Sequence, residues 1–303
     1  MCKKSKEWGD LQSLKGGTKS KSLPMKKRWL KNWVCVGLSL CFFLLSMLCT
    51  VECGVYYRKN DNAHWTPNYD KKNILPLLLK ESRTEADYDV LYAQTGLTAL
   101  GIEDLIAIKN YSRILAIQES YFKEYKIYIK EFAPFTYTKK IHEDAEVALL
   151  QNGDIFLSSS AFTSWFEYGH SALVVDGEKE FLVDSVTIGK NSALTSIKSL
   201  KSHAKFLILR PTVDEETRSA VAKYAWEHLT GKPYDFTVGI LSPKYSDNLQ
   251  GTHCAHLVWY AYKRFGIDLD STGGRIVTPQ DLANSPHLQL VQTFGFDPQT
   301  LWS

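Results

Sequence analysis

Cys254 is the one cysteine of this 303-residue chain that lies beyond residue 53, and it begins a segment with helical periodicity. A lone thiol is either a small core residue or a nucleophile. Gly251 and Thr252 mark a helix start, where unpaired N–H groups and the helix dipole stabilise a thiolate. The same N–H groups would serve as oxyanion donors to a carbonyl attacked by sulfur. We therefore interpret Cys254 as a nucleophile on the buried side of its helix, since apolar residues follow it at helical spacing: Leu257, Val258, Ala261 and Phe265.

A thiolate nucleophile needs an imidazole partner that activates it and protonates the leaving group. His170 is the candidate, because it opens a predicted strand directly after Gly169, and glycine allows another element to approach closely. The remaining histidines outside the Cys254 helix occupy less suitable places. We expect His64 in a linker, His142 in a helical region, His203 and His287 in polar loops, and His228 on an amphipathic helix.

The base in turn needs a group that orients it, and the strand after His170 offers Asp184 or Ser185. Side chains alternate between faces along a strand, so the hairpin register decides between the two. A three-residue turn at 177–179 pairs residues whose numbers sum to 356, and it places Asp184 on the face of His170. A two-residue turn presents Ser185 instead. We favour Asp184, because a carboxylate holds the imidazole tautomer and stabilises the imidazolium.

Two other interpretations of these residues stay open. His253, Cys254, His256 and His170 are plausible zinc ligands. Zinc needs three or four converging ligands, however, and His253 and His256 diverge from the face of Cys254 on a helix. We therefore expect no metal and no cofactor. The second alternative is a surface binding module that keeps the fold without catalysis.

The elements that position these residues begin at Gly153. Short strands are predicted at 154–157, 170–175, 180–186 and 205–210, separated by Gly, Asp and Ser turns. A helix with acidic first-turn residues follows Pro211 and runs to Leu229, and the Cys254 helix ends near Gly266. Because strands and helices segregate in blocks, the predicted class is α+β with a small antiparallel sheet packed on helices.

Residues 76–150 are predicted to be a helical region that packs on the following domain as a spacer or cap. Residues at three- and four-residue spacing form a mostly apolar stripe there: Leu105, Ile108, Ser112, Leu115, Glu119, Phe122, Lys126 and Ile129. The polar segment 55–75 before it is expected to be a linker. The predicted organisation is completed by a domain at 151–303.

The first 54 residues predict a membrane anchor. Residues 1–31 carry ten Lys/Arg against two acids, a net charge of +8, whereas the rest of the chain totals −5. A nucleic-acid-binding protein carries its positive charge on its folded part, and here the folded part is negative, so we expect no nucleic-acid partner. Twenty uncharged residues separate Lys31 from Glu52, enough to cross a bilayer core. We predict a cytoplasmic tail at 1–31, a single-pass anchor at 32–54 and an extracellular remainder, with a cleaved signal peptide as the rival.

Six sequence blocks stand in the order of a known family: NGDIF (152–156), YGHSALVV (168–175), FLVDS (181–185), GKPYDF (231–236), HCAHLVWYAY (253–262) and GIDLD (266–270). Together they resemble the YiiX/YebB-like branch of the circularly permuted, papain-fold NlpC-type cysteine hydrolases. The resemblance covers about 150–297. It implies Cys254 as nucleophile, His170 as base and Asp184 as third residue, where the family more often has Glu.

The resemblance also bears on three neighbouring residues. Tyr234 and Asp235 match the family's aromatic–acid pair and would shape the pocket. His253 stands where the family commonly has Tyr, on the substrate or oxyanion side. The expected function is a membrane-anchored extracellular cysteine hydrolase that cleaves an amide, in a peptide or amino-acid conjugate of cell-wall origin. A lipid acyl hydrolase or acyltransferase is the alternative. The lack of a cysteine pair in the exported part favours a Gram-positive source.

Overall fold

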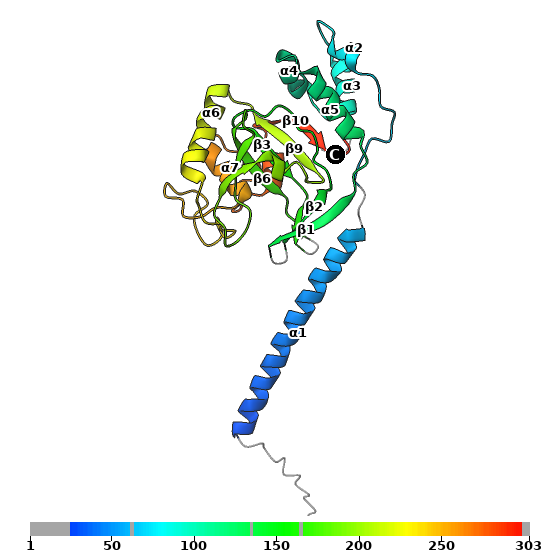
Figure 1. Ribbon diagram of the computed structural model, residues 1–303. Helices are drawn as coiled ribbons and strands as arrows, with labels where there is room; N and C mark the ends of the chain where they lie inside the picture. Colours follow the sequence, from blue (N-terminus) through cyan, green and yellow to red (C-terminus); the bar gives the residue numbers. More distant parts are fainter. Residues whose placement is uncertain (1–24, 61–63, 134–135, 164–165, 299–303) are drawn as a thin grey trace, which may run out of the picture. The chain divides into compact units, whose positions relative to one another are not determined.

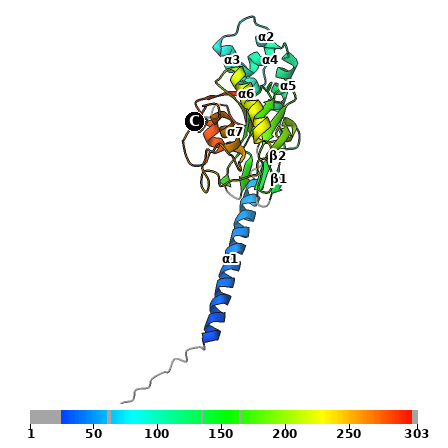
Figure 2. The ribbon, with the colours of Figure 1, turned by 90° about the vertical axis from the view of Figure 1, so that its left-hand side faces the viewer.

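A computed structural model describes residues 25–60, 64–133, 136–163 and 166–298. The chain divides into two compact units, Met1–Cys49 and Thr50–Ser303. Most of the predicted basic tail, residues 1–24, lies outside the described residues. The first long helix, α1 (Met25–Asn60), is continuous (Figures 1 and 2) and extends into the predicted linker. Within it, Asn32–Gly54 has a mean hydropathy of 2.4. This segment is long and apolar enough for a membrane anchor, and a signal sequence has the same properties.

The second unit has a mixed α+β fold with two antiparallel sheets, which confirms the predicted class. The larger sheet has six strands in the order β10-β9-β3-β6-β7-β8. Their bounds are β3 (Ile155–Ser158), β6 (His170–Asp176), β7 (Phe181–Asp184), β8 (Ala193–Ser196), β9 (Phe206–Pro211) and β10 (Leu288–Phe294). The four strands predicted from the sequence correspond to β3, β6, β7 and β9. The sheet lies centrally in the unit, with helices on either side (Figure 1).

Alternation along the strands divides the apolar residues between two cores. Ile155 and Leu173 belong to one core, with residues of α6 (Glu215–Tyr224) and α7 (Cys254–Lys263). Phe156 and Val174 belong to the other, with residues of the segment 74–150. Successive side chains on a strand point to opposite faces, so the sheet is covered on both sides. The expectation that the region 76–150 packs on the later domain is confirmed, because the second of these cores contains residues from both.

The structure corrects the predicted helical region. Helices α2 (Leu75–Leu78), α3 (Glu85–Thr95), α4 (Ala99–Ala107) and α5 (Tyr111–Phe122) end at Phe122. They are followed by strands β1 (Ile127–Ala133) and β2 (Thr136–Ile141), which pair in the second sheet, of order β1-β2-β4-β5. The other two strands of this sheet are β4 (Ala161–Thr163) and β5 (Phe166–Glu167). The run of alternating aromatic and β-branched residues from Ile127 favours a strand over a helix.

The predicted apolar stripe is wrong in phase as well as in length. Lys109 adopts a positive φ of 55°, and the Asn110 side chain caps α5, so the helix restarts between the two halves of the stripe. Ile108, a stripe member, is 54% exposed, whereas Ile114 and Ile117 are buried. The apolar spacing from Leu105 to Ile129 therefore crosses a helix boundary and does not describe a single helix.

Three further elements complete the chain. The helix after Pro211 begins at Glu215 with Asp214 as its N-cap, and its last turn, η2 (Ala225–Leu229), is a π-helix. A short 3₁₀ turn, η1 (Ile197–Ser199), follows β8. Helix α8 (Pro279–Ala283) is closed by a capping box between Thr278 and Asp281.

Candidate active site

Cys254 is the first residue of α7, as the sequence indicates. The N-cap is His253, whose Nδ1 accepts a hydrogen bond from the backbone N–H of His256 at 3.5 Å. Cys254 is 8% exposed, and the helix beyond it packs into the core through Leu257 and Val258. The N–H groups of a first helical turn have no partner within their own helix, so those of Cys254 and Ala255 are not used by the helix itself.

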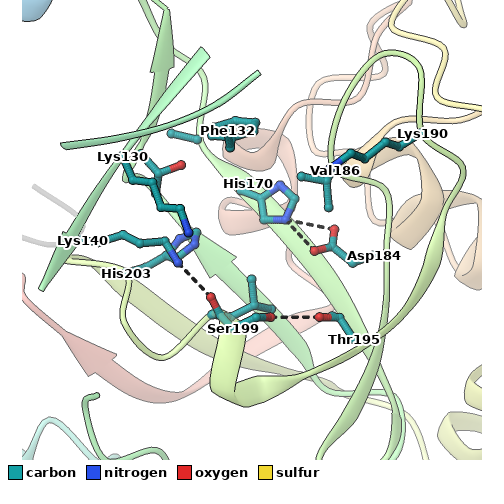
Figure 3. A pocket seen from close by; sticks show the side chains of 13 residues that line it. Lys130, Phe132, Lys140, His170, Asp184, Val186, Lys190, Thr195, Ser199 and His203 are labelled. Atoms are coloured by element: carbon teal, nitrogen blue, oxygen red, sulfur yellow. Dashed lines mark hydrogen bonds and ion pairs between the residues drawn. The ribbon is translucent and has the colours of Figure 1, made fainter. Parts of the chain in front are cut away.

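His170 and Asp184 lie together at one end of the neighbouring strands β6 and β7, where β6 begins and β7 ends. The Nε2 atom of His170 is 2.9 Å from Oδ1 and 3.1 Å from Oδ2 of Asp184 (Figure 3). The two residues are 8% and 4% exposed. Since Nε2 is engaged by the carboxylate, Nδ1 is the ring nitrogen left to interact with the Cys254 thiol, which helps to raise the pKa of His170.

The predicted hairpin register is confirmed, by a slightly different turn. Leu173 pairs with Val183 and Val174 with Leu182, so the paired numbers sum to 356. The turn occupies four residues, 177–180, rather than three, and a bulge between Val174 and Asp176 absorbs the additional residue. Asp184 therefore faces His170. The alternative, Ser185, donates its hydroxyl hydrogen bond to the carbonyl oxygen of Thr252 at 3.2 Å.

The glycine before His170 is required by the backbone. Gly169 has a φ of 73°, in the left-handed region that other residues rarely adopt. A Cβ atom at this position would lie 2.8 Å from the carbonyl oxygen of Ser158 on the neighbouring strand β3. The close approach inferred from the sequence is thus an approach of strand to strand, and it fixes where His170 begins β6.

Electrostatics in the site favour charge on both reacting groups. Burial raises the pKa of Cys254, but the interactions of the sulfur with His170 and His253 outweigh it and lower the pKa to about 5. Burial lowers the pKa of His170, but the charge and hydrogen bond of Asp184, together with Cys254, raise it well above its ordinary value. At neutral pH these opposite shifts favour a thiolate–imidazolium pair.

The three other candidate residues differ in their relation to the thiol. Tyr234 and His253 line the same cavity as Cys254, about 370 Å³ in volume. Asp235 does not line it, because its Oδ1 accepts from the backbone N–H and the hydroxyl of Thr237, at 2.8 and 2.6 Å. Asp235 thus shapes the loop before α7. The rest of the cavity is largely apolar, with Phe166, Tyr168, Phe236, Ile276, Val277 and Pro279 among its walls.

His256, considered above as a metal ligand, has both ring nitrogens engaged. Its Nε2 donates to the carbonyl oxygen of Lys244 at 2.7 Å, and its Nδ1 accepts from the Thr252 hydroxyl at 2.9 Å. Burial lowers its pKa to about 4, which keeps the ring neutral. Among the described residues no group of three or more His, Cys, Asp or Glu side chains is arranged to hold a metal ion. The histidine therefore ties α7 to the preceding loop.

Sequence reasoning missed one buried residue near the site. His203, expected in a polar loop, is 5% exposed, and its ring centroid lies 6.2 Å from that of His170. Its Nδ1 is 3.0 Å from the hydroxyl oxygen of Ser158, which itself donates to the carbonyl oxygen of Lys205. His203 is therefore the donor of this contact. Its polar neighbours in sequence concealed its burial, which arises from packing between segments distant in the chain.

Comparison with known proteins gives one distant relative. The chain is 25% identical over 158 residues to the protein named "Uncharacterized protein YycO" of Bacillus subtilis (strain 168), which is 52% of this chain. The match spans 59% of that relative's length. No family model matches the chain. No solved structure matches it either.

Proposed function

We propose that this protein is a cysteine hydrolase in which Cys254 is the nucleophile, His170 the acid–base catalyst and Asp184 the residue that orients His170. The observation that carries the proposal is a buried thiol at a helix N-terminus that interacts electrostatically with an imidazole, whose Nε2 is 2.9 Å from a buried carboxylate. This combination supplies a nucleophile, a proton carrier and a tautomer-fixing acid.

The reaction would proceed in two halves. The Cys254 thiolate attacks a carbonyl carbon, and the bond to the leaving group breaks as Nδ1–H of His170 protonates it, which leaves a thioester. A water molecule then gives one proton to His170 and attacks the thioester, releasing the acid and restoring the thiolate–imidazolium pair. Developing negative charge on the carbonyl oxygen is met by the first-turn N–H groups of α7. The buried Nε2 of His253 has no hydrogen-bond partner and lines the same cavity, so it is a further candidate donor.

The sequence blocks support a circularly permuted papain-like fold of the YiiX/YebB-like kind for residues 151–303. In it the strand that bears His170 precedes the helix that bears Cys254. The apolar segment 32–54 would anchor the protein, with the basic tail cytoplasmic and the catalytic part extracellular. An amide in a peptide or amino-acid conjugate is the first candidate substrate.

A lipid acyl group is the second candidate, favoured by the walls of the cavity over Cys254. Phe166 is 69% exposed and Phe236 is 56% exposed, although both are large apolar side chains. Exposed aromatic residues beside a nucleophile suit an apolar acyl chain better than a hydrated sugar or a charged peptide. The membrane anchor would bring either substrate within reach.

Alkylation of Cys254 against pH tests the mechanism. The full-length protein in detergent is treated with iodoacetamide, and labelling of the Cys254 peptide is followed by mass spectrometry, which separates it from the other cysteines. The wild type should show an inflection near 5, far below the roughly 8.5 of a free thiol. In His170→Ala the inflection should move toward that value. A Cys254 that labels only in the alkaline range in both proteins would contradict the proposal and favour a non-catalytic binding module.

A further inference from the structure

A second cavity of about 370 Å³ lies against the catalytic pair, separate from the one over Cys254. His170 and Asp184 form part of its wall, and Cys254 does not (Figure 3). Its other walls come from strands β1 and β2 of the second sheet and from the segment 186–203. His170 therefore interacts with the Cys254 thiol and also faces a chamber built by distant parts of the chain.

The charged side chains that line this cavity are mostly positive. Three lysines line it, Lys130 of β1, Lys140 of β2 and Lys190 of the loop after β7, and Asp184 is the one acidic residue on its walls. Asp184 is already engaged with His170. The Lys140 ammonium donates to the carbonyl oxygen of Ser199 and to the hydroxyl of Ser202, both at 3.0 Å, and these are uncharged acceptors. Lysine charges gathered without acids are unfavourable unless an anion binds among them.

Two of these lysines, Lys130 and Lys190, are available to bind a ligand. In the part of the chain that the structure describes, neither Lys130 nor Lys190 has an ion pair or side-chain hydrogen bond, and both are exposed. By contrast, many other surface lysines are paired, as Lys179 is with Asp176 at 2.8 Å. Burial and the charge of Lys130 lower the pKa of Lys140 more than the charge of Asp144, which lies outside the cavity wall, raises it.

The position of the cavity relative to the reaction gives its role. In the proposed mechanism His170 hands a proton to the leaving group, so that group must depart beside the imidazole. The acyl part would lie over Cys254, among apolar walls. The lysine-lined cavity shares no lining residue with that one but is walled by His170 itself, so a leaving group beside Nδ1 would extend past the imidazole ring into it.

We infer that this cavity, through Lys130, Lys140 and Lys190, binds an anionic group, carboxylate or phosphate, on the leaving portion of the substrate. The inference rests on the proposed hydrolase function and narrows its substrate class. The substrate would be an apolar acyl group joined to an amine or alcohol that bears negative charge. Lysine binds such groups as a point charge, so both oxyanions are suitable.

Three iodoacetamide probes with the same short linker test this inference on the full-length protein in detergent. One ends in a carboxylate (N-iodoacetylglycine), one in a phosphonate (N-iodoacetyl-aminomethylphosphonate) and one in a neutral amide (N-iodoacetylglycinamide). Labelling rates of the Cys254 peptide are compared in the wild type, in Lys130→Gln/Lys190→Gln and in the control Lys179→Gln. Among the described residues the two substituted side chains have no ion pair or hydrogen bond, and Lys179 lies at the opposite end of the β6–β7 hairpin from His170.

The wild type and the control should label with at least one anionic probe about tenfold faster than with the neutral probe, since a charge-assisted contact carries about that factor. The double variant should lose this preference while its rate with the neutral probe stays unchanged. The more strongly preferred anion identifies a carboxylate or a phosphate as the natural group. Equal rates with all three probes in the wild type would overturn the inference, while leaving the nucleophile intact. Failure of the neutral probe to label Cys254 at all would instead contradict the proposed function.

Discussion

Two buried histidines, His170 and His203, have ring centroids 6.2 Å apart. Their pKa values are nevertheless shifted in opposite directions. Burial lowers the pKa of both. For His170 the carboxylate of Asp184 and the Cys254 thiol reverse the effect and raise the pKa well above its ordinary value. For His203 the charges of His170 and Lys140 add to burial, and the pKa falls well below it.

The difference shows what separates a buried imidazole that carries charge from one that stays neutral in this fold. Each ring donates or accepts one hydrogen bond across the same part of the sheet, His170 with an acid and His203 with the hydroxyl of Ser158. Only the acid stabilises the imidazolium. Burial alone would have left His170 neutral, and Cys254 would then lack its counterion.

The largest expected effect comes from removing the charge beside His170, so that its imidazole becomes neutral like that of His203. Asp184→Asn keeps the shape of the side chain and removes its charge, so His170 should lose most of its protonated population and the pKa of Cys254 should rise. Alkylation of Cys254 at about pH 6 should slow by roughly two orders of magnitude, as the thiolate fraction falls. Unchanged labelling in this variant would show that Asp184 does not set the charge of the pair. Retention of the native near-ultraviolet circular dichroism serves as the control for folding.

A second prediction concerns stability in acid. A buried neutral histidine binds no proton in the folded state below its unfolded pKa, while the unfolded chain does, so stability falls as pH decreases below about 6.5. His203 should contribute about 1.4 kcal/mol per pH unit to this slope. In His203→Asn, whose amide can still donate to Ser158, the slope of the unfolding free energy between about pH 6.5 and 5 should be shallower by that amount. Urea denaturation at several pH values measures it, and an unchanged slope would mean that His203 is protonated in the native state.

The smallest effect is expected at Ser185, the neighbour of Asp184. Its hydroxyl is buried and bonded to the Thr252 carbonyl, so Ser185→Ala should cost about 1 kcal/mol of unfolding free energy. The pH profile of Cys254 labelling should stay that of the wild type. A shift of that profile comparable to the one in Asp184→Asn would assign the orienting role to Ser185.

The sequence was informative where the relevant structure is local. Cys254 at a helix start and His170 after a glycine are features of a few consecutive residues, and the Asp184 register follows from a single hairpin. The bulge after Val174 compensates for the longer turn, so Asp184 lies on the predicted face of the sheet, the face of His170. Four strands of the larger sheet were also found from their local pattern.

What could not be predicted depends on contacts between distant segments. His203 is buried because it packs against β3, and the lysine-lined cavity combines β1, β2 and the loop after β7. The apolar spacing from Leu105 to Ile129 predicts one helical region at 76–150, but it crosses the break at Lys109 and Asn110 and continues into strand β1. Its strands β1 and β2 gain their stability from pairing with each other and with β4, which no local window reveals.

The central claim is that Cys254 and His170 form an ion pair in the resting protein. Thiolates absorb in the ultraviolet where thiols do not, so the absorbance difference between the wild type and Cys254→Ser, followed against pH, measures the charge of this sulfur directly. The account predicts a thiolate signal that is fully present at neutral pH and disappears near pH 5. A signal that appears only in the alkaline range, near the roughly 8.5 of a free cysteine, would contradict it.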